Sequence, residues 1–137
     1  MSLWTRFLSV RGLVFGLSEH QLDSDPIRQF HRWYRFARFA GCFWPNSFAL
    51  ATVGVDGRPA VRMMLLKGVD ERGFVFYTHY VGRKAEELER VPYAAMVFHW
   101  SELIRQVRVE GPVERISRQE SEAYFRTRPR TSRIGAW

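Results

Sequence analysis

The side chains best suited to chemistry in this sequence are cations, and two of them differ from the rest. Lys67 and Lys84 are the only lysines among 21 cationic residues, and both lie within residues 62–84. A lysine presents a compact point charge that suits a phosphate oxygen, whereas an arginine presents a broad planar fork. Gly82, Arg83 and Lys84 also precede a short helical pattern, where backbone amides and cationic side chains converge. This pattern indicates phosphate binding, but as a lone signal it is weak, because many helices begin near a basic residue.

The stretch that carries these cations is predicted to be an antiparallel hairpin. Two apolar runs, RMMLLK and FVFYTH, flank a polar connection at residues 69–73. Side chains alternate along a strand, so Arg62 and Lys67, an odd number of residues apart, point to opposite faces. Arg62 therefore serves one ligand, and Lys67 serves another ligand or another part of the same one. The faces are predicted to hold Arg62, Met64 and Leu66 on one side and Met63, Leu65 and Lys67 on the other.

Helices are predicted on both sides of this hairpin. Asp25 before Pro26 is a strong helix start, and apolar residues then recur at helical spacing until Gly41. A short helix over residues 85–90 is stopped by Pro92, and a capping box at Ser117 begins a last helix that Pro129 ends. Tyr124 and Arg128, four residues apart, are expected to share one face of that last helix.

Further strands are predicted around the hairpin. Residues 48–53 form a short strand ended by Asp56-Gly57, and Pro59 opens the next one. The continuous apolar run 94–100 indicates a buried strand. Residues 104–116 alternate apolar with charged side chains and predict a long strand bent at Gly111-Pro112. The fold class expected from these elements is mostly β with flanking helices.

Composition limits the classes of protein that this chain can belong to. The 137 residues fit one domain, and a net charge of +7 favours anionic partners, which include nucleic acid, acidic lipid and phosphorylated small molecules. The chain has one cysteine, Cys42, so an intrachain disulfide is excluded. We expect Cys42 to be a buried free thiol and the protein to reside in a reducing, cytoplasmic setting. The histidines show no ligand spacing, and glycine-rich nucleotide motifs and hydrolase motifs are absent, which disfavours a metal hydrolase or a Rossmann dehydrogenase. Residues 1–24 are expected to be an N-terminal arm, neither a membrane span nor a transit peptide.

Several motifs occur together in an order that resembles one known family. They are DPIRQFHRW, PNSFALATVGVDGRPAVRMMLLK, ERGFVFYTHYVGRK, RQVRVEGPVER and EAYFRTRPRTSRIGAW, and they cover residues 25–137. Together they resemble the pyridoxamine 5'-phosphate oxidase family, the flavin enzymes of vitamin B6 metabolism. The resemblance implies a domain over residues 25–137 with the FMN-binding split β-barrel fold. It also implies a homodimer that holds each FMN between its subunits, with no role for nucleic acid or membrane.

The same resemblance implies roles for individual residues. In the family, one strand runs along the FMN, and its positions correspond here to Arg62, Met63, Met64, Leu65 and Lys67. Further flavin contacts of the family correspond to Tyr77, Thr78 and Gln106. The pair that binds the FMN phosphate matches Arg83 and Lys84. The pocket for the phosphate of the substrate matches Lys67, Tyr124, Arg128 and Ser132. No catalytic acid or base and no metal ligand is implied.

The implied reaction is the oxidation of pyridoxamine or pyridoxine 5'-phosphate to pyridoxal 5'-phosphate, with O2 as acceptor and H2O2 as product. Two features of this chain depart from the family pattern and affect the expected reaction. Gly82 stands where the family usually has a hydroxyl residue, and the chain stops at Trp137, before the C-terminal segment with the Arg-x-His motif. We therefore expect a C-terminally truncated relative with impaired turnover. A flavin- or B6-phosphate-binding module without turnover is the alternative, and a basic nucleic-acid binder is a third hypothesis.

Overall fold

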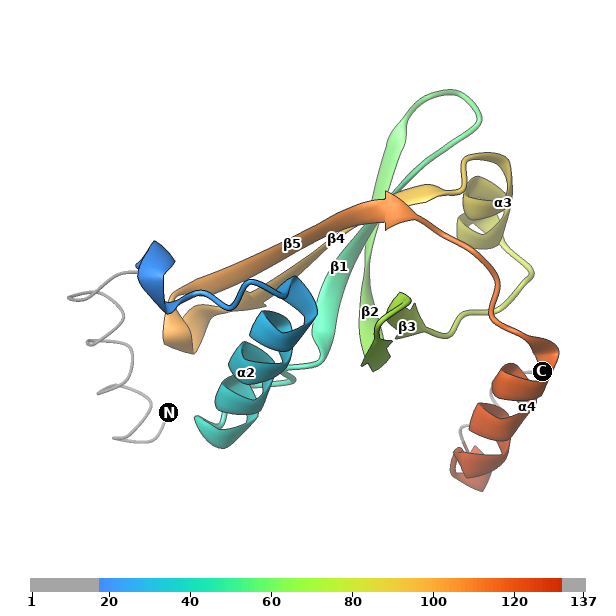
Figure 1. The fold of residues 1–137 in the computed structure, drawn as a ribbon. Coiled ribbons are helices and arrows are strands. Elements are labelled where there is room, and N and C mark those ends of the chain that lie inside the picture. Colours follow the sequence, from blue (N-terminus) through green and yellow to red (C-terminus); the bar gives the residue numbers. More distant parts are fainter. Residues whose placement is uncertain (1–17, 132–137) are drawn as a thin grey trace.

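The computed structural model describes residues 18–131, which form one curled antiparallel sheet with helices around it (Figure 1). The strand order is β3-β2-β1-β4-β5, and every neighbouring pair is antiparallel. The mostly β prediction with flanking helices is therefore confirmed. The strands are β1 (Ser47–Val53), β2 (Pro59–Asp70), β3 (Gly73–Phe76), β4 (Tyr93–Trp100) and β5 (Arg105–Pro112). The helices are α2 (Pro26–Phe39), α3 (Arg83–Arg90) and α4 (Arg118–Thr127), with 3-10 turns η1 (Glu19–Gln21) and η2 (Ser101–Leu103).

Helix α2 begins as the sequence predicts. The Asp25 side chain accepts hydrogen bonds from the backbone amides of Ile27 and Arg28, and Pro26 occupies the first helical position. Its buried face carries Phe30 and Ala37, while its arginines are exposed. These arginines therefore form a solvated face of the helix.

The core lies between α2 and the concave side of the sheet. The ring of Phe30 lies 4.8 Å from that of Phe74 and 5.0 Å from that of Phe98, measured between ring centroids. Phe48 and Trp100 complete a continuous aromatic layer with Phe98, and all three are almost fully buried. The indole nitrogen of Trp100 donates to the carbonyl of Pro45 at 2.9 Å, so its one polar atom is satisfied.

Strand β2 alternates as predicted. Arg62, Met64 and Leu66 turn toward the covered side of the sheet, whereas Met63 and Leu65 are exposed on the other side. The ladder between β2 and β3 is irregular between Leu66 and Gly68, at Lys67. Lys67 is exposed. The alternation of the strand up to Leu66 places it on the face opposite to Arg62.

Three predicted boundaries were wrong. The strand predicted to continue through His79 ends at Phe76, and Tyr77 stacks instead on α4. The long strand does not bend at Gly111-Pro112 but ends there. The amide of Val113 still donates to the carbonyl of Pro92, but Pro92 has no amide to continue the ladder. Helix α3 begins at Arg83 and not at residue 85, so both predicted phosphate ligands fall in its first turn.

A fourth correction concerns Arg128. Helix α4 has the predicted capping box at Ser117 and Glu120, but it ends at Thr127. Arg128 has an extended backbone with ψ 142°, because the residue before a proline is disfavoured from helical geometry. The predicted i, i+4 pairing of Tyr124 with Arg128 on one helical face is therefore wrong.

None of the helices within residues 18–131 combines the length and the apolar character that crossing a bilayer requires.

Candidate functional site

Three predicted cofactor ligands gather at the first turn of α3. Arg62 reaches there from β2, and its Nη2 lies 2.8 Å from Oε2 of Glu87. The Nε of Arg83 lies 2.7 Å from Oε1 of the same carboxylate. The Nζ of Lys84 lies 3.8 Å from the Sδ of Met64, a residue of β2. We call these five residues the α3 cluster, in which two arginines contact one carboxylate and Lys84 lies in the same helical turn as Arg83.

The backbone at the start of α3 has the geometry of an anion site. Gly82 precedes the helix with φ +113°, a conformation that side chains with a Cβ rarely adopt. Its carbonyl accepts from the amides of Ala85 and Glu86. The amides of Arg83 and Lys84 belong to the first turn, where a helix has no internal acceptors. This arrangement supplies amides and positive charge at one point, which is what a phosphate requires.

Burial, hydrogen bonds and neighbouring charges shift the pKa values of two side chains in the α3 cluster. Partial burial, together with the nearby charge of Arg62, lowers the pKa of Lys84. The pKa of Glu87 is lowered to about 2, first by the hydrogen bond from the Thr52 hydroxyl and then by those from Arg62 and Arg83, against the opposing effect of burial. The carboxylate is therefore ionised at neutral pH, and the α3 cluster keeps a net positive charge.

Glu87 and Thr52 are the members of this site that the sequence analysis missed. Glu87 follows Arg83 by four residues, which is the spacing of an ion pair on a helix, so a signal was present. The hydroxyl of Thr52 donates to Glu87 and also receives a hydrogen bond from Arg62. Nothing in the sequence indicates that β1 brings this threonine to α3.

The connection between β3 and α3 contains a second polar feature. The Oγ1 atom of Thr78, a predicted flavin contact, is buried and has no hydrogen-bond partner within residues 18–131. A buried hydroxyl without a partner is costly, so such an atom commonly meets a ligand or an ordered water. Thr78 thus fits a ligand site on the same connection that leads to Arg83 and Lys84.

A separate cavity of about 300 Å³ collects three other predicted residues. Lys67, Tyr77 and Tyr124 line it, together with residues of β3 and α4. The rings of Tyr77 and Tyr124 are stacked, with centroids 3.7 Å apart and an interplanar angle of 6°. Lys67 Nζ lies 5.8 Å from the centroid of Tyr124. We call this group the tyrosine pocket, and burial raises the pKa of Tyr77 within it.

An ion pair holds α4 beside the tyrosine pocket. Arg72, in the turn between β2 and β3, lies 3.0 Å from Glu120 in the first turn of α4 and also pairs with Asp70. Glu120 is the same residue that completes the capping box with Ser117. The side chain that stabilises the start of α4 thus also connects it to the sheet.

Other predicted residues are not brought to either group. Gln106 is exposed on β5, three strands away from β2, which corresponds to roughly 14 Å at the usual strand spacing. Arg128 is half-buried just beyond α4, with no ion pair to another described residue. Ser132 lies outside the described residues. Met63 and Leu65 are on β2 but face away from the α3 cluster.

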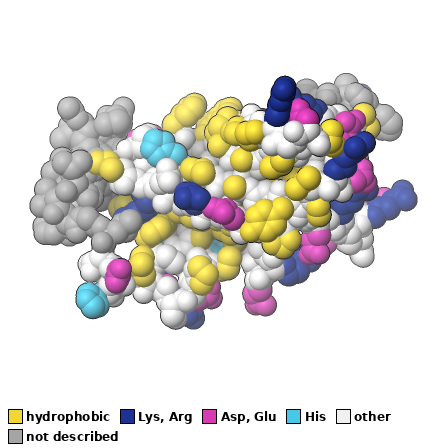
Figure 2. Space-filling view, turned by 90° about the horizontal axis from the view of Figure 1, so that it is seen from above, with side chains coloured by type: hydrophobic (Ala, Val, Ile, Leu, Met, Phe, Trp, Pro, Cys, Tyr) yellow, Lys and Arg dark blue, Asp and Glu magenta, His cyan; other side chains and the backbone are white. Residues whose placement is uncertain are grey.

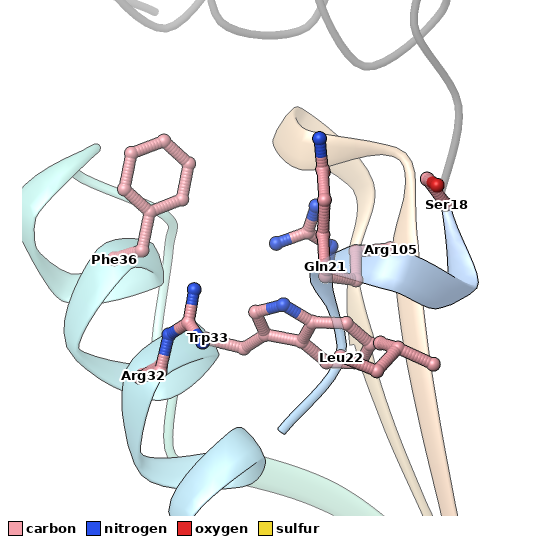
Figure 3. A pocket seen from close by; sticks show the side chains of 7 residues that line it. All are labelled: Ser18, Gln21, Leu22, Arg32, Trp33, Phe36 and Arg105. Atoms are coloured by element: carbon pink, nitrogen blue, oxygen red, sulfur yellow. The ribbon is translucent and has the colours of Figure 1, made fainter. Parts of the chain in front are cut away.

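A further cavity of about 300 Å³ lies between η1, α2 and the start of β5 (Figure 3). Arg105 lies over the ring of Trp33, with its Cζ 4.6 Å from the ring centroid, and Arg32 and Phe36 line the same hollow. Burial lowers the pKa of Arg105. None of its lining residues was predicted to bind the cofactor or the substrate.

Comparison with known proteins identifies relatives over most of the chain. Residues 43–137 match the family described as pyridoxamine 5'-phosphate oxidase. A pyridoxine/pyridoxamine 5'-phosphate oxidase of Rubrobacter xylanophilus is 59% identical over 122 residues, which are 89% of this chain and 56% of that protein. The corresponding protein of Burkholderia multivorans is 55% identical over 122 residues, 89% of this chain and 57% of its own. The chain thus spans little more than half the length of these curated relatives.

Solved structures share the fold. PhzG from Burkholderia lata, in complex with tetrahydrophenazine-1-carboxylic acid, superposes with a TM-score of 0.78 at 30% identity, over 82% of this chain and 57% of that one. A pyridoxamine 5'-phosphate oxidase-related, FMN-binding protein from Nostoc punctiforme gives a TM-score of 0.67 at 21% identity, over 82% and 63% of the two chains. The second likeness shows the fold alone. The predicted split-barrel fold is confirmed, and the chain belongs to the pyridoxamine 5'-phosphate oxidase family.

Proposed function

We propose that this chain binds FMN and contributes to the oxidation of pyridoxine or pyridoxamine 5'-phosphate to pyridoxal 5'-phosphate, with O2 as acceptor and H2O2 as product. The observation that carries the proposal is the convergence of Arg62, Arg83 and Lys84 on the first turn of α3. Relatives named as oxidases of these two vitamers support the substrate class.

The residues of the α3 cluster fit the phosphate of FMN. Arg83 and Lys84 would contact its oxygens directly, and Arg62 would add charge from β2 below them. The hydroxyl of Thr78, buried without a described partner, is available to the same ligand. Residues 62–67 of β2 and Tyr77 would lie along the flavin ring.

The tyrosine pocket fits the second phosphate. Lys67 supplies a cation at its edge, and Tyr124 supplies a hydroxyl and a flat apolar face. Arg128 and Ser132 would complete this group. When bound, FMN would supply the hydride-accepting chemistry, and the residues of the chain would hold the two phosphates at a set separation.

The outer face of the sheet supports a homodimer as part of this proposal. Apolar side chains are exposed among charged and polar ones when the molecule is seen from above (Figure 2). On the outer face of β2, Val61 and Met63 are 66% and 65% exposed, and Leu65 lies on the same face. Exposed apolar patches of this kind mark interaction surfaces. In this proposal Gln106, which is exposed on β5, would contact the flavin held by a second copy.

Two measurements on the whole chain test the proposal. FMN and riboflavin are titrated while flavin fluorescence is followed, because the two differ only by the phosphate. We expect FMN to bind more tightly, by about tenfold or more, as a charge-assisted phosphate contact requires. Equal affinities would contradict the phosphate site.

The second measurement follows H2O2 and pyridoxal 5'-phosphate after pyridoxine 5'-phosphate is added to the FMN-loaded chain in air. Formation of both products supports the oxidase. FMN binding without either product supports the alternative, a flavin-binding module without turnover.

A further inference from the structure

The buried carboxylate of Glu87 has an unusual set of partners. Its side chain is only 4% exposed, yet each of its oxygens contacts an arginine that we assign to the FMN site. Oε2 accepts from Arg62 and from the Thr52 hydroxyl, and Oε1 accepts from Arg83. An anion therefore already occupies the place where positive charge is gathered for a phosphate.

The two arginines are held to very different degrees. The Arg62 side chain is 22% exposed, and it also donates to Thr52 and to backbone carbonyls of β1 and β2. The Arg83 side chain is 72% exposed, and within residues 18–131 its guanidinium makes one ion pair, with Glu87. A guanidinium that is exposed and has a single partner is held less firmly than one with several acceptors. Arg83 is thus the partner that can leave.

Charge balance explains why Glu87 is needed when no phosphate is bound. Arg62, Arg83 and Lys84 would otherwise place three positive charges together, and the charge of Arg62, second to partial burial, already lowers the pKa of Lys84. A bound phosphate dianion would supply the compensating charge itself. It would also be repelled by the ionised Glu87 a short distance away.

We propose that Glu87 acts as a resident counter-ion of the cofactor site, which holds Arg83 until a phosphate takes it over while Arg62 stays in place. This inference rests on the proposed FMN site and adds its regulation. Glu87 is a positioning residue in this scheme, because it acts through the two arginines. Phosphate binding then exchanges one anionic partner of Arg83 for another, without a change in the covalent structure.

The first test uses the Glu87→Gln variant, whose amide keeps the shape of the side chain and removes its charge. Without ligand the variant should melt at a lower temperature than the wild type, because its cations lose their counter-charge. FMN should bind about two- to fivefold more tightly, since the competitor for Arg83 is weakened. Riboflavin affinity should not change. Glu89→Gln, an exposed ion-paired residue on the same helix, is the matched control and should alter none of these values.

A double variant separates this role from a purely structural one. In the Arg83→Gln background, the added Glu87→Gln change should no longer tighten FMN binding, because the exchanged arginine is gone. A gain of the same size in both backgrounds would overturn the proposal, and so would an unchanged or weaker FMN affinity in the single variant.

The wild-type chain offers a test that requires no variant to fold. Nitrogen-15 NMR of arginine Nε–H groups during an FMN titration should show the Arg83 signal moving strongly and the Arg62 signal moving little. An Arg83 signal that is unmoved at FMN saturation would overturn the exchange while leaving FMN binding intact. Absence of FMN binding altogether would instead overturn the proposed function together with this inference.

Discussion

Lys84 provides the sharpest test of the proposed cofactor site, because its charge is poorly compensated in the free protein. Within the described part of the chain, its ammonium contacts the thioether of Met64 and makes no ion pair. Burial and the charge of Arg62 both lower its pKa, so the fold does not gain stability from this cation. We therefore examine the change Lys84→Met, which keeps the length of the side chain and removes the charge.

The expected loss follows from one contact. A hydrogen bond to a charged group contributes about 1.5–3 kcal/mol, and a factor of ten in affinity corresponds to about 1.4 kcal/mol. The Kd for FMN should therefore rise about 10- to 150-fold in Lys84→Met. The free energy of unfolding without ligand should stay the same or increase, because a charge that the fold disfavours has been removed.

Flavin fluorescence titration with FMN and with riboflavin, followed by urea unfolding of the free proteins, measures both quantities. Riboflavin affinity should be unchanged, because riboflavin has no phosphate. Arg90→Met is the control: it removes one exposed cation from the same helix, about 9 Å further along the axis, and should leave FMN affinity unaltered. An FMN Kd within about twofold of wild type in Lys84→Met would refute our reasoning.

Three further predictions concern the fold around the site. Phe98→Ala should lower the free energy of unfolding by about 3–5 kcal/mol in urea titrations, because Phe98 is fully buried among aromatic rings, and a loss below 1 kcal/mol would contradict this packing. Burial and the neighbouring Glu102 raise the pKa of the Cys42 thiol to about 11, so a thiol reagent at pH 8 should react only after the protein is denatured, and fast stoichiometric labelling of the native protein would show otherwise. The pKa of Glu87 is lowered to about 2 from its ordinary 4.5, so its stabilising contribution is present above pH 4.5 and is lost as the pH falls toward 2. Acid unfolding curves of the wild type and Glu87→Gln should converge over this range, and parallel curves would disprove the assignment.

Local signals in the sequence predicted most of the fold. The Asp25-Pro26 start of α2 and the capping box at Ser117 depend on a few adjacent residues, and both were confirmed. The alternation of β2 was also confirmed, because a strand with one covered face must alternate. Membership of the family was likewise predicted correctly from the ordered motifs.

The errors arose where a long-range contact or a proline decided the outcome. Tyr77 leaves the strand because it packs on Tyr124, a residue 47 positions later that strand propensity does not take into account. Arg128 leaves the helix because Pro129 follows it, a local signal that the helical spacing argument overlooked. Glu87 could be paired with Arg83 from spacing, but its contacts with β1 and β2 depend on the sheet and were not predictable.

The stacked pair of tyrosines has a consequence for anything flat that enters between β3 and α4. Rings 3.7 Å apart are at contact distance, so no third ring fits between them while they remain stacked. A planar guest that inserts there must first separate them, at a cost of about 0.5–1.5 kcal/mol, which weakens its affinity roughly 2- to 13-fold. The stacked pair therefore opposes the entry of a planar guest. Separation of the two rings would change the tyrosine absorbance as the guest enters.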